Sequence, residues 1–183
     1  MTDESTIYSH PFRVADLPAR KATRFDLAPD KAARDRIGAV LDVTTLEDLR
    51  LRGELRPTGR RDWVLEAKLT AKVTQPCVVT LAPVVTRIEE TVTRQYLAEW
   101  TAPEGEEVEM PEDDNTEPLP AINDAGTVLI EALTLALPLY PRADGAELGE
   151  TRLTEPGAEP LSDDDLKPFA GLADLIKKSE DQA

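Results

Sequence analysis

The residue types best suited to nucleophilic or metal chemistry are scarce in this sequence. It contains one cysteine, Cys77, and one histidine, His10. A thiol nucleophile needs a base beside it, and we expect His10 to lie in a frayed N-terminal segment. A structural zinc site needs about four ligands, mainly thiolates and imidazoles, and one of each is too few. The sequence therefore indicates no catalytic residue, no metal site and no cofactor.

Carboxylates are plentiful, but their setting favours solvation over chemistry. They gather in polar, proline-rich stretches, whereas acid–base catalysis needs them in a cleft that excludes water. Residues 103–121 carry eight acids and no base. Their spacing does not match a calcium-loop signature, so a solvated loop is preferred to a calcium site. The glycines are scattered and form no nucleotide-binding fingerprint, and no small-molecule substrate is evident.

Basic residues are the better candidates for binding, because several fall on predicted strands. Contact with RNA phosphate needs cations gathered in one patch, even on an acidic protein. The same cations could instead balance neighbouring acids on a solvated face, and the sequence leaves both interpretations open. With aromatic residues at 4%, stacking on single-stranded bases is not supported. The candidate RNA-binding residues are Arg50, Arg52, Arg56, Arg60, Arg61, Lys68 and Lys72.

The charge is divided unevenly along the chain. Residues 13–94 hold 16 Lys and Arg against 12 Asp and Glu, a net of +4, and residues 95–183 hold 5 against 22, a net of -17. With -2 from residues 1–12, these give the formal -15 of the whole chain. The two halves would present opposite fields to a partner. The net charge alone therefore does not exclude nucleic acid.

The elements that must hold a basic patch read as β structure between residues 46 and 100. Apolar and polar residues alternate over 63–74, and period two over this length is typical of a strand with one buried face. Residues 46–55 predict the preceding strand, and the two predict an antiparallel hairpin with a basic outer face. Residues 84–96 could form a helix, but their β-branched residues favour a third strand.

Two helices are predicted before and after these strands. Asp30 is a plausible N-cap for an amphipathic helix over 31–41. Asn123 or Asp124 could cap a second helix over 128–137. Because that segment is apolar nearly all round, we expect it to be buried.

The remaining segments are predicted to be short strands, loops or a terminal helix. Residues 10–29 read as two short strands or extended segments. Residues 103–121 are predicted to be a mobile acidic loop and 142–165 a linker. A C-terminal helix is predicted from apolar residues at helical spacing, namely Phe169, Leu172, Leu175 and Ile176.

Three segments follow one another with the order and spacing of a known family. The first runs from Val73 through Cys77 to Pro83 and leads into a long strand. The second is Glu131-Ala-Leu-Thr-Leu-Ala-Leu-Pro-Leu-Tyr-Pro141, and the third begins Lys167-Pro-Phe-Ala-Gly-Leu. In this succession the chain resembles the YceD family, which is associated with accumulation of large-subunit ribosomal RNA. The motif residues, which we interpret as structural, are Pro76, Cys77, Leu81, Pro83, Glu131, Leu135, Pro138, Pro141 and Phe169.

The sequence departs from the commoner family pattern at the cysteines. Many relatives carry Cys-x-x-Cys and further cysteines after the second segment, an arrangement that could bind metal. Here Thr80 stands at the second cysteine position, and residues 142–150 contain no cysteine. The chain thus resembles a branch that lacks this arrangement. Cys77 is then expected to be a small buried residue at a bend of the chain.

Taken together, the sequence predicts an α+β fold in a single domain over residues 1–183. An antiparallel sheet, which could be strongly curved or barrel-like, packs against the buried helix, with the N- and C-terminal helices flanking it. The acidic N-terminus lacks the features of a signal peptide, and no apolar run reaches the roughly 20 residues that span a bilayer. We therefore predict a cytoplasmic protein without membrane contact.

The resemblance implies a non-catalytic factor that supports large-subunit ribosomal RNA accumulation or processing and ribosome assembly. The expected partner is ribosomal RNA, at the basic hairpin, or a large-subunit ribosomal protein, at the acidic half. Two alternatives stay open. The chain could be a protein-binding module that never touches RNA, or a metal-dependent enzyme of RNA maturation.

Overall fold

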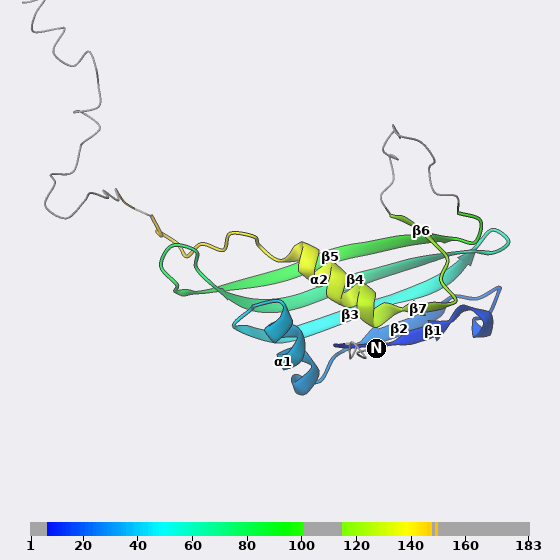
Figure 1. Cartoon of the computed structure of the whole chain (residues 1–183), viewed down its shortest axis with the longest axis horizontal. Coiled ribbons are helices and arrows are strands. Elements are labelled where there is room, and N and C mark those ends of the chain that lie inside the picture. Colours follow the sequence, from blue (N-terminus) through cyan, green and yellow to red (C-terminus); the bar gives the residue numbers. More distant parts are fainter. Residues whose placement is uncertain (1–6, 101–114, 148, 150–183) are drawn as a thin grey trace, which may run out of the picture. The chain divides into compact units, whose positions relative to one another are not determined.

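The computed structural model describes residues 7–100, 115–147 and 149 (Figure 1). Contacts divide the chain into the units Met1–Ala146 and Glu147–Ala183, and every element named below belongs to the first. In chain order these elements are β1 (Pro11–Arg13), the 3-10 helix η1 (Val14–Asp16), β2 (Thr23–Leu27), α1 (Lys31–Val40), β3 (Thr45–Thr58), β4 (Asp62–Pro76), β5 (Pro83–Leu97), β6 (Thr116–Pro118), β7 (Ile122–Asp124) and α2 (Ala125–Ala136).

The strands form two sheets, and the larger one is open. Its five strands lie in the order β2-β3-β4-β5-β6, antiparallel except for the short β5–β6 pair, and β1 pairs with β7 in a separate two-stranded sheet. The predicted α+β class is confirmed. The barrel-like form is not supported, because β2 and β6 stand at the two ends of the strand order and do not pair to close the sheet.

One face of the five-stranded sheet, the inner face, forms the core. Along β4 the alternate residues from Trp63 to Val73 are buried, as period two predicted. The register places Ala71 between Leu49 of β3 and Ile88 of β5, so the buried residues of neighbouring strands share this face. Residues 84–96, for which the sequence favours a strand over a helix, do form a strand, β5.

A bulge explains the less regular pattern of β3. The register shifts between Leu46 and Asp48, so that Glu47 is an extra residue in this strand. A bulge of this kind reverses which residues of the strand face inward. Leu46 and Leu49 are three positions apart and are nevertheless both buried in the core cluster.

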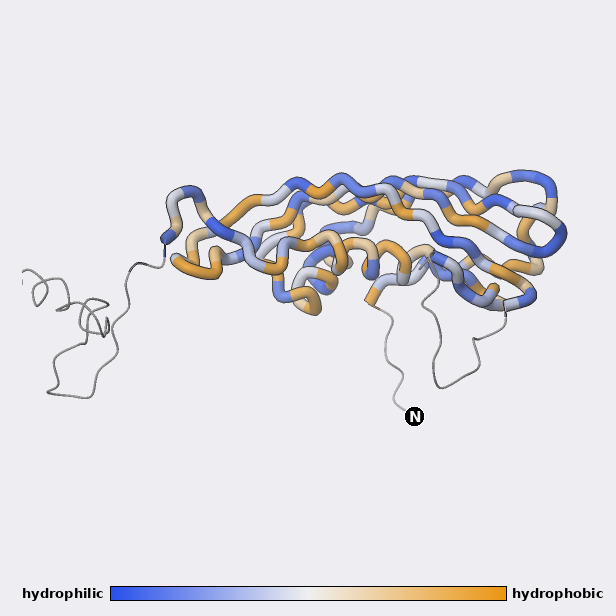
Figure 2. The backbone as a smooth tube through the Cα atoms, turned by 90° about the horizontal axis from the view of Figure 1, so that it is seen from above, coloured by the Kyte–Doolittle hydropathy of each residue, from blue (hydrophilic) through white to orange (hydrophobic). Residues whose placement is uncertain are grey.

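Both helices pack on the inner face, as the two views show (Figures 1 and 2). Asp30 caps α1, as predicted, and Ile37 of that helix is fully buried. Of the two caps considered for α2, Asp124 is the one used. Leu129 and Leu133 of α2 are fully buried, and the helix contacts β4 and β5.

Leu135 corrects the expectation that the second helix is buried all round. Its side chain is 81% exposed, because only one stripe of α2 faces the sheet and this residue lies outside it. An apolar composition alone does not say how many sides of a helix are covered.

Two further expectations are wrong in part. Residues 116–118 of the predicted acidic loop form β6, because they pair with residues 95–97 of β5; residues 103–114 lie outside the described residues. His10 is not frayed, since its N–H donates to Asp124 at 2.7 Å and its C=O accepts from Ala125 at 3.1 Å. The C-terminal helix and residues 150–165 of the linker also lie outside the described residues.

Candidate functional site

The outer face of the sheet is formed by the side chains that alternate with the buried ones. It carries five of the predicted RNA-binding residues, and Arg60 and Arg61 lie at the β3–β4 turn. Neither helix covers this face, because both pack on the opposite side (Figure 2). The charged residues of the outer face are Arg24, Asp26, Asp48, Arg50, Arg52, Glu54, Arg56, Glu66, Lys68, Lys72, Arg87 and Glu89.

Most of these cations are held by carboxylates on neighbouring strands. Arg50 reaches Asp26 through two hydrogen bonds of 2.6 and 2.5 Å. This contact lowers the pKa of Asp26 and raises that of Arg50. The other pairs are Arg24–Glu54, Arg56–Glu66, Lys68–Glu89 and Lys72–Glu47, with Arg61–Glu99 at the turn. The sheet face is therefore of mixed charge rather than uniformly basic.

Two cross-strand pairs on this face nevertheless bring cation opposite cation. Arg52 stands opposite Lys68, and Lys72 stands opposite Arg87. Like charges directly opposite each other destabilise a sheet. Among the described residues, Arg52 and Arg87 have no carboxylate within ion-pair distance. Of the two, Arg52 also stands opposite Asp26 of β2 and helps to lower the pKa of that carboxyl, so an external anion meets less competition at Arg87.

One of the like-charge pairs lies in a groove. A cavity of about 760 Å³ opens where β3, β4 and β5 pass the start of α1. Four cations line it, Arg34, Arg50, Lys72 and Arg87, together with the carboxylates of Asp48 and Glu89. The candidates predicted from the sequence did not include Arg34 and Arg87. Arg87 could have been found by applying the period-two pattern to the next predicted strand as well, which places its side chain on the outer face.

Cys77 lies fully buried in the turn between β4 and β5, as expected, and its thiol is free. The sulfur accepts hydrogen bonds from the N–H groups of Val79, Thr80 and Ala143 at 3.3–3.4 Å. The Thr80 hydroxyl, then these N–H groups, lower the pKa of Cys77 to about 6 against the opposing effect of burial. The residue at the second cysteine position of the family therefore turns its polar groups toward the sulfur.

The two residues that could have formed a nucleophile–base pair are held near opposite ends of α2. His10 bonds to the N-cap Asp124, and Cys77 bonds to Ala143, which follows the helix. A 12-residue helix is about 18 Å long. Cys77 and His10 are thus not brought together.

The first two family-like segments meet at the Cys77 turn. Gln75 donates to the carbonyl of Pro138 at 3.3 Å, and Val78 N–H donates to that of Pro141 at 2.9 Å. Pro76 ends β4 opposite Pro83, which begins β5. Leu81 has a φ of 60° and is exposed.

The rest of the second segment lies along α2. Glu131 binds Arg94 at 3.1 Å, and Leu135 is exposed. Phe169, in the third segment, lies outside the described residues.

Within the described ranges, no group of three or more His, Cys, Asp or Glu side chains is placed to hold a metal ion. None of the described helices is both long and apolar enough to cross a membrane.

These observations define an α+β protein with an open, mostly antiparallel sheet, helices on one face and a charged opposite face. A family model described as "Large ribosomal RNA subunit accumulation protein YceD" matches residues 65–176. The chain belongs to the YceD family. Comparison with curated proteins gave no match, nor did comparison with solved structures.

Proposed function

We propose that the protein is a non-catalytic factor in large-subunit ribosomal RNA accumulation, and that it binds RNA phosphates through the outer face. The observation that carries this proposal is the groove of about 760 Å³ where β3, β4 and β5 pass the start of α1, with the outer-face cations Lys72 and Arg87 side by side in it. A cation opposite another cation costs stability. A phosphate between the two would remove that cost.

The ion pairs set the scale of the expected binding. Lys72 forms an ion pair with Glu47, and Arg50 forms one with Asp26. A phosphate must therefore compete with a carboxylate for each of these cations. The pairs are exposed, and exposed pairs contribute about 0–1 kcal/mol, so this competition is mild. Few strong contacts are available, and we expect modest affinity with a shallow dependence on salt.

The test is binding of a labelled large-subunit ribosomal RNA fragment, measured by fluorescence anisotropy over a series of salt concentrations. Changing Lys72→Ala together with Arg87→Ala should weaken binding at least tenfold. It should also reduce the salt slope by about 2, because each of these two cations would neutralise one phosphate. The matched control is Arg20→Ala with Arg36→Ala, which removes the same charge from exposed positions outside the sheet. Equal weakening in the two double variants, or no binding by the wild type at low salt, would refute the proposed interaction.

The absence of catalysis is part of the proposal and has its own test. Precursor RNA is incubated with the pure protein with and without Mg²⁺, and the fragments are resolved on a denaturing gel. We expect intact RNA in both cases. Metal-dependent cleavage that follows the protein through purification would identify an RNA-maturation enzyme instead.

A further inference from the structure

Most of one long edge of the sheet has no partner strand among the described residues. β5 runs over Pro83–Leu97, but β6 pairs with it only at residues 95–97. There, Gln95 N–H donates to Asn115 and the Leu97 carbonyl accepts from Leu119. Backbone groups of successive strand residues point to alternate sides, and the β4–β5 register has no shift. The N–H and C=O groups of Val85, Arg87, Glu89, Thr91 and Thr93 therefore point to the open edge.

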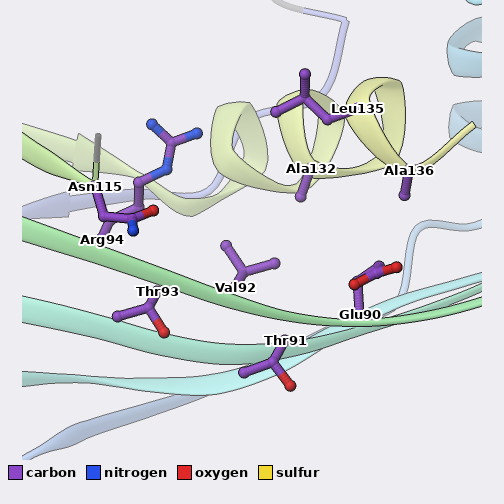
Figure 3. Close-up of a pocket in the computed structure, with 9 residues that line it drawn as sticks. All are labelled: Glu90, Thr91, Val92, Thr93, Arg94, Asn115, Ala132, Leu135 and Ala136. Atoms are coloured by element: carbon purple, nitrogen blue, oxygen red, sulfur yellow. The ribbon is translucent and has the colours of Figure 1, made fainter. Parts of the chain in front are cut away.

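A groove runs beside this edge, between β5 and α2 (Figure 3). Its volume is about 330 Å³, and residues 90–94 of β5 form its floor. Ala132, Leu135 and Ala136 of α2 form its wall, and Val92 points across it toward Ala132 (Figure 3). An added strand could thus bond to the edge and place every second side chain beside Val92 and the apolar side chains of α2, within a groove that is otherwise polar.

The charge around the groove selects the kind of strand. Glu90 is exposed and has no ion-pair partner among the described residues. Arg94 is shared between Glu117 and Glu131. Three carboxylates, Glu90, Glu117 and Glu131, thus stand against one guanidinium in and beside the groove, and the field there is negative.

We infer that the edge of β5 and the flank of α2 form a binding site for an extended basic segment of another protein, which adds to the sheet as a strand. Main-chain hydrogen bonds to the open edge supply affinity. Aliphatic side chains at alternate positions enter the groove, and Lys or Arg side chains between them meet the carboxylates. The site is separate from the outer-face groove, so it does not depend on RNA binding.

The peptide experiment separates strand addition from simple charge attraction. The probe is a fluorescent nine-residue peptide in which Val alternates with Lys or Arg, titrated with the full chain. Its counterpart carries N-methyl groups on alternate amides, which removes donors for the edge and keeps the charge. We expect the methylated peptide to bind at least tenfold more weakly, and a Val/Glu peptide not to bind. Equal binding of the methylated and unmethylated peptides would overturn the inference.

Two exposed leucines of the α2 region give a matched pair of variants. Leu135 lines the groove and is 81% exposed, whereas Leu139 is 85% exposed and does not line it. Both tolerate substitution because neither is in the core. Leu135→Lys should weaken binding of the basic peptide at least fivefold, and Leu139→Lys should leave it within twofold. If the two variants bind the basic peptide equally well, the peptide does not occupy the groove.

Other occupants would be recognised in the same measurements. If a second copy pairs along β5, gel filtration with light scattering will show a dimer that the basic peptide does not dissociate, and the inference fails. It also fails if the wild type binds none of the peptides. Lys72→Ala, on β4 and away from the open edge, should weaken RNA binding and leave peptide binding unchanged, so a failure of the RNA proposal and a failure of this one are distinguishable.

Discussion

Asp124 should matter more to stability than an ordinary helix cap, because it joins two parts of the fold. Its carboxylate accepts from Gly126 N–H at 2.8 Å and Thr127 N–H at 3.4 Å at the start of α2. It also accepts from the Ser9 hydroxyl at 2.5 Å and His10 N–H at 2.7 Å. Burial raises its pKa, but these four bonds outweigh burial and hold the pKa below the usual value.

The cost of Asp124→Ala follows from counting these bonds. Loss of an N-cap costs about 1 kcal/mol, and the two bonds from the N-terminal segment, which are exposed, add about 0.5 kcal/mol each. The total is about 2 kcal/mol, or a fall in melting temperature of roughly 5–8 °C for a unit of this size. The matched control is Asp30→Ala in α1, where the side chain accepts only from Ala33 N–H. It should cost about 1 kcal/mol.

Calorimetry or urea unfolding of both variants, with Asp124→Asn as a cap-preserving third, provides the comparison. If Asp124→Ala costs no more than Asp30→Ala, the N-terminal contacts contribute nothing and the reasoning is wrong. The pH dependence follows from the lowered pKa. The contribution of Asp124 is present above the unfolded pKa of about 3.9 and is lost as pH falls through the lower folded value.

Three more outcomes are expected. The ultraviolet absorbance of the Cys77 thiolate should titrate near pH 6 in the native protein. The stability advantage of the wild type over Cys77→Ser should be full above the unfolded pKa of about 8.5 and vanish as pH falls to about 6. A difference in stability that does not change with pH would refute the lowered pKa. Leu133→Ala should cost about 2–5 kcal/mol in urea unfolding and Leu135→Ala almost nothing, because only Leu133 is buried. Gly53→Ala should cost about 1–3 kcal/mol by the same assay, since a Cβ there would lie 2.3 Å from the Glu66 carbonyl oxygen; an unchanged midpoint would show that the strands can separate locally.

The long strands could be predicted because their signal is local. Burial on one face forces period two, and the residues from Trp63 to Val73 follow it except at Val64, which is buried on the outer face. The same logic identified Asp30, since a cap acts on residues within its own first turn. The bulge at Glu47 interrupts the period-two pattern of β3. The buried residues on its two sides still lie on the same face of the sheet, because the bulge adds one residue to the strand.

Pairing between distant segments could not be read in the same way. β6 has three residues within an acidic stretch and exists because they pair with residues 95–97. β7 likewise depends on β1, more than a hundred positions earlier in the chain. His10 looked frayed for the same reason: its partner, Asp124, is remote in sequence. Such contacts have no signature in the short window that contains either partner.

The sequence predicted which basic residues share a face of the sheet, but not which carboxylates pair with them. The strand pattern placed Arg50, Lys68 and Lys72 on one face, and the register confirms this. The sequence left open whether neighbouring acids balance them, and the ion pairs show that carboxylates hold all three. Arg87 was overlooked because its importance comes from standing opposite Lys72.

The two proposed surfaces share β5 but use different atoms of it. The side chain of Arg87 lines the outer groove, while its N–H and C=O point to the open edge, and Glu90 faces the inner side. RNA and a basic peptide would thus occupy opposite faces of one strand. We therefore expect the peptide to bind with the same affinity, within twofold, when the chain is saturated with the RNA fragment. If the peptide displaces the RNA from this chain, both ligands bind the same surface of mixed charge. The assignment of RNA and peptide to two separate faces would then be wrong.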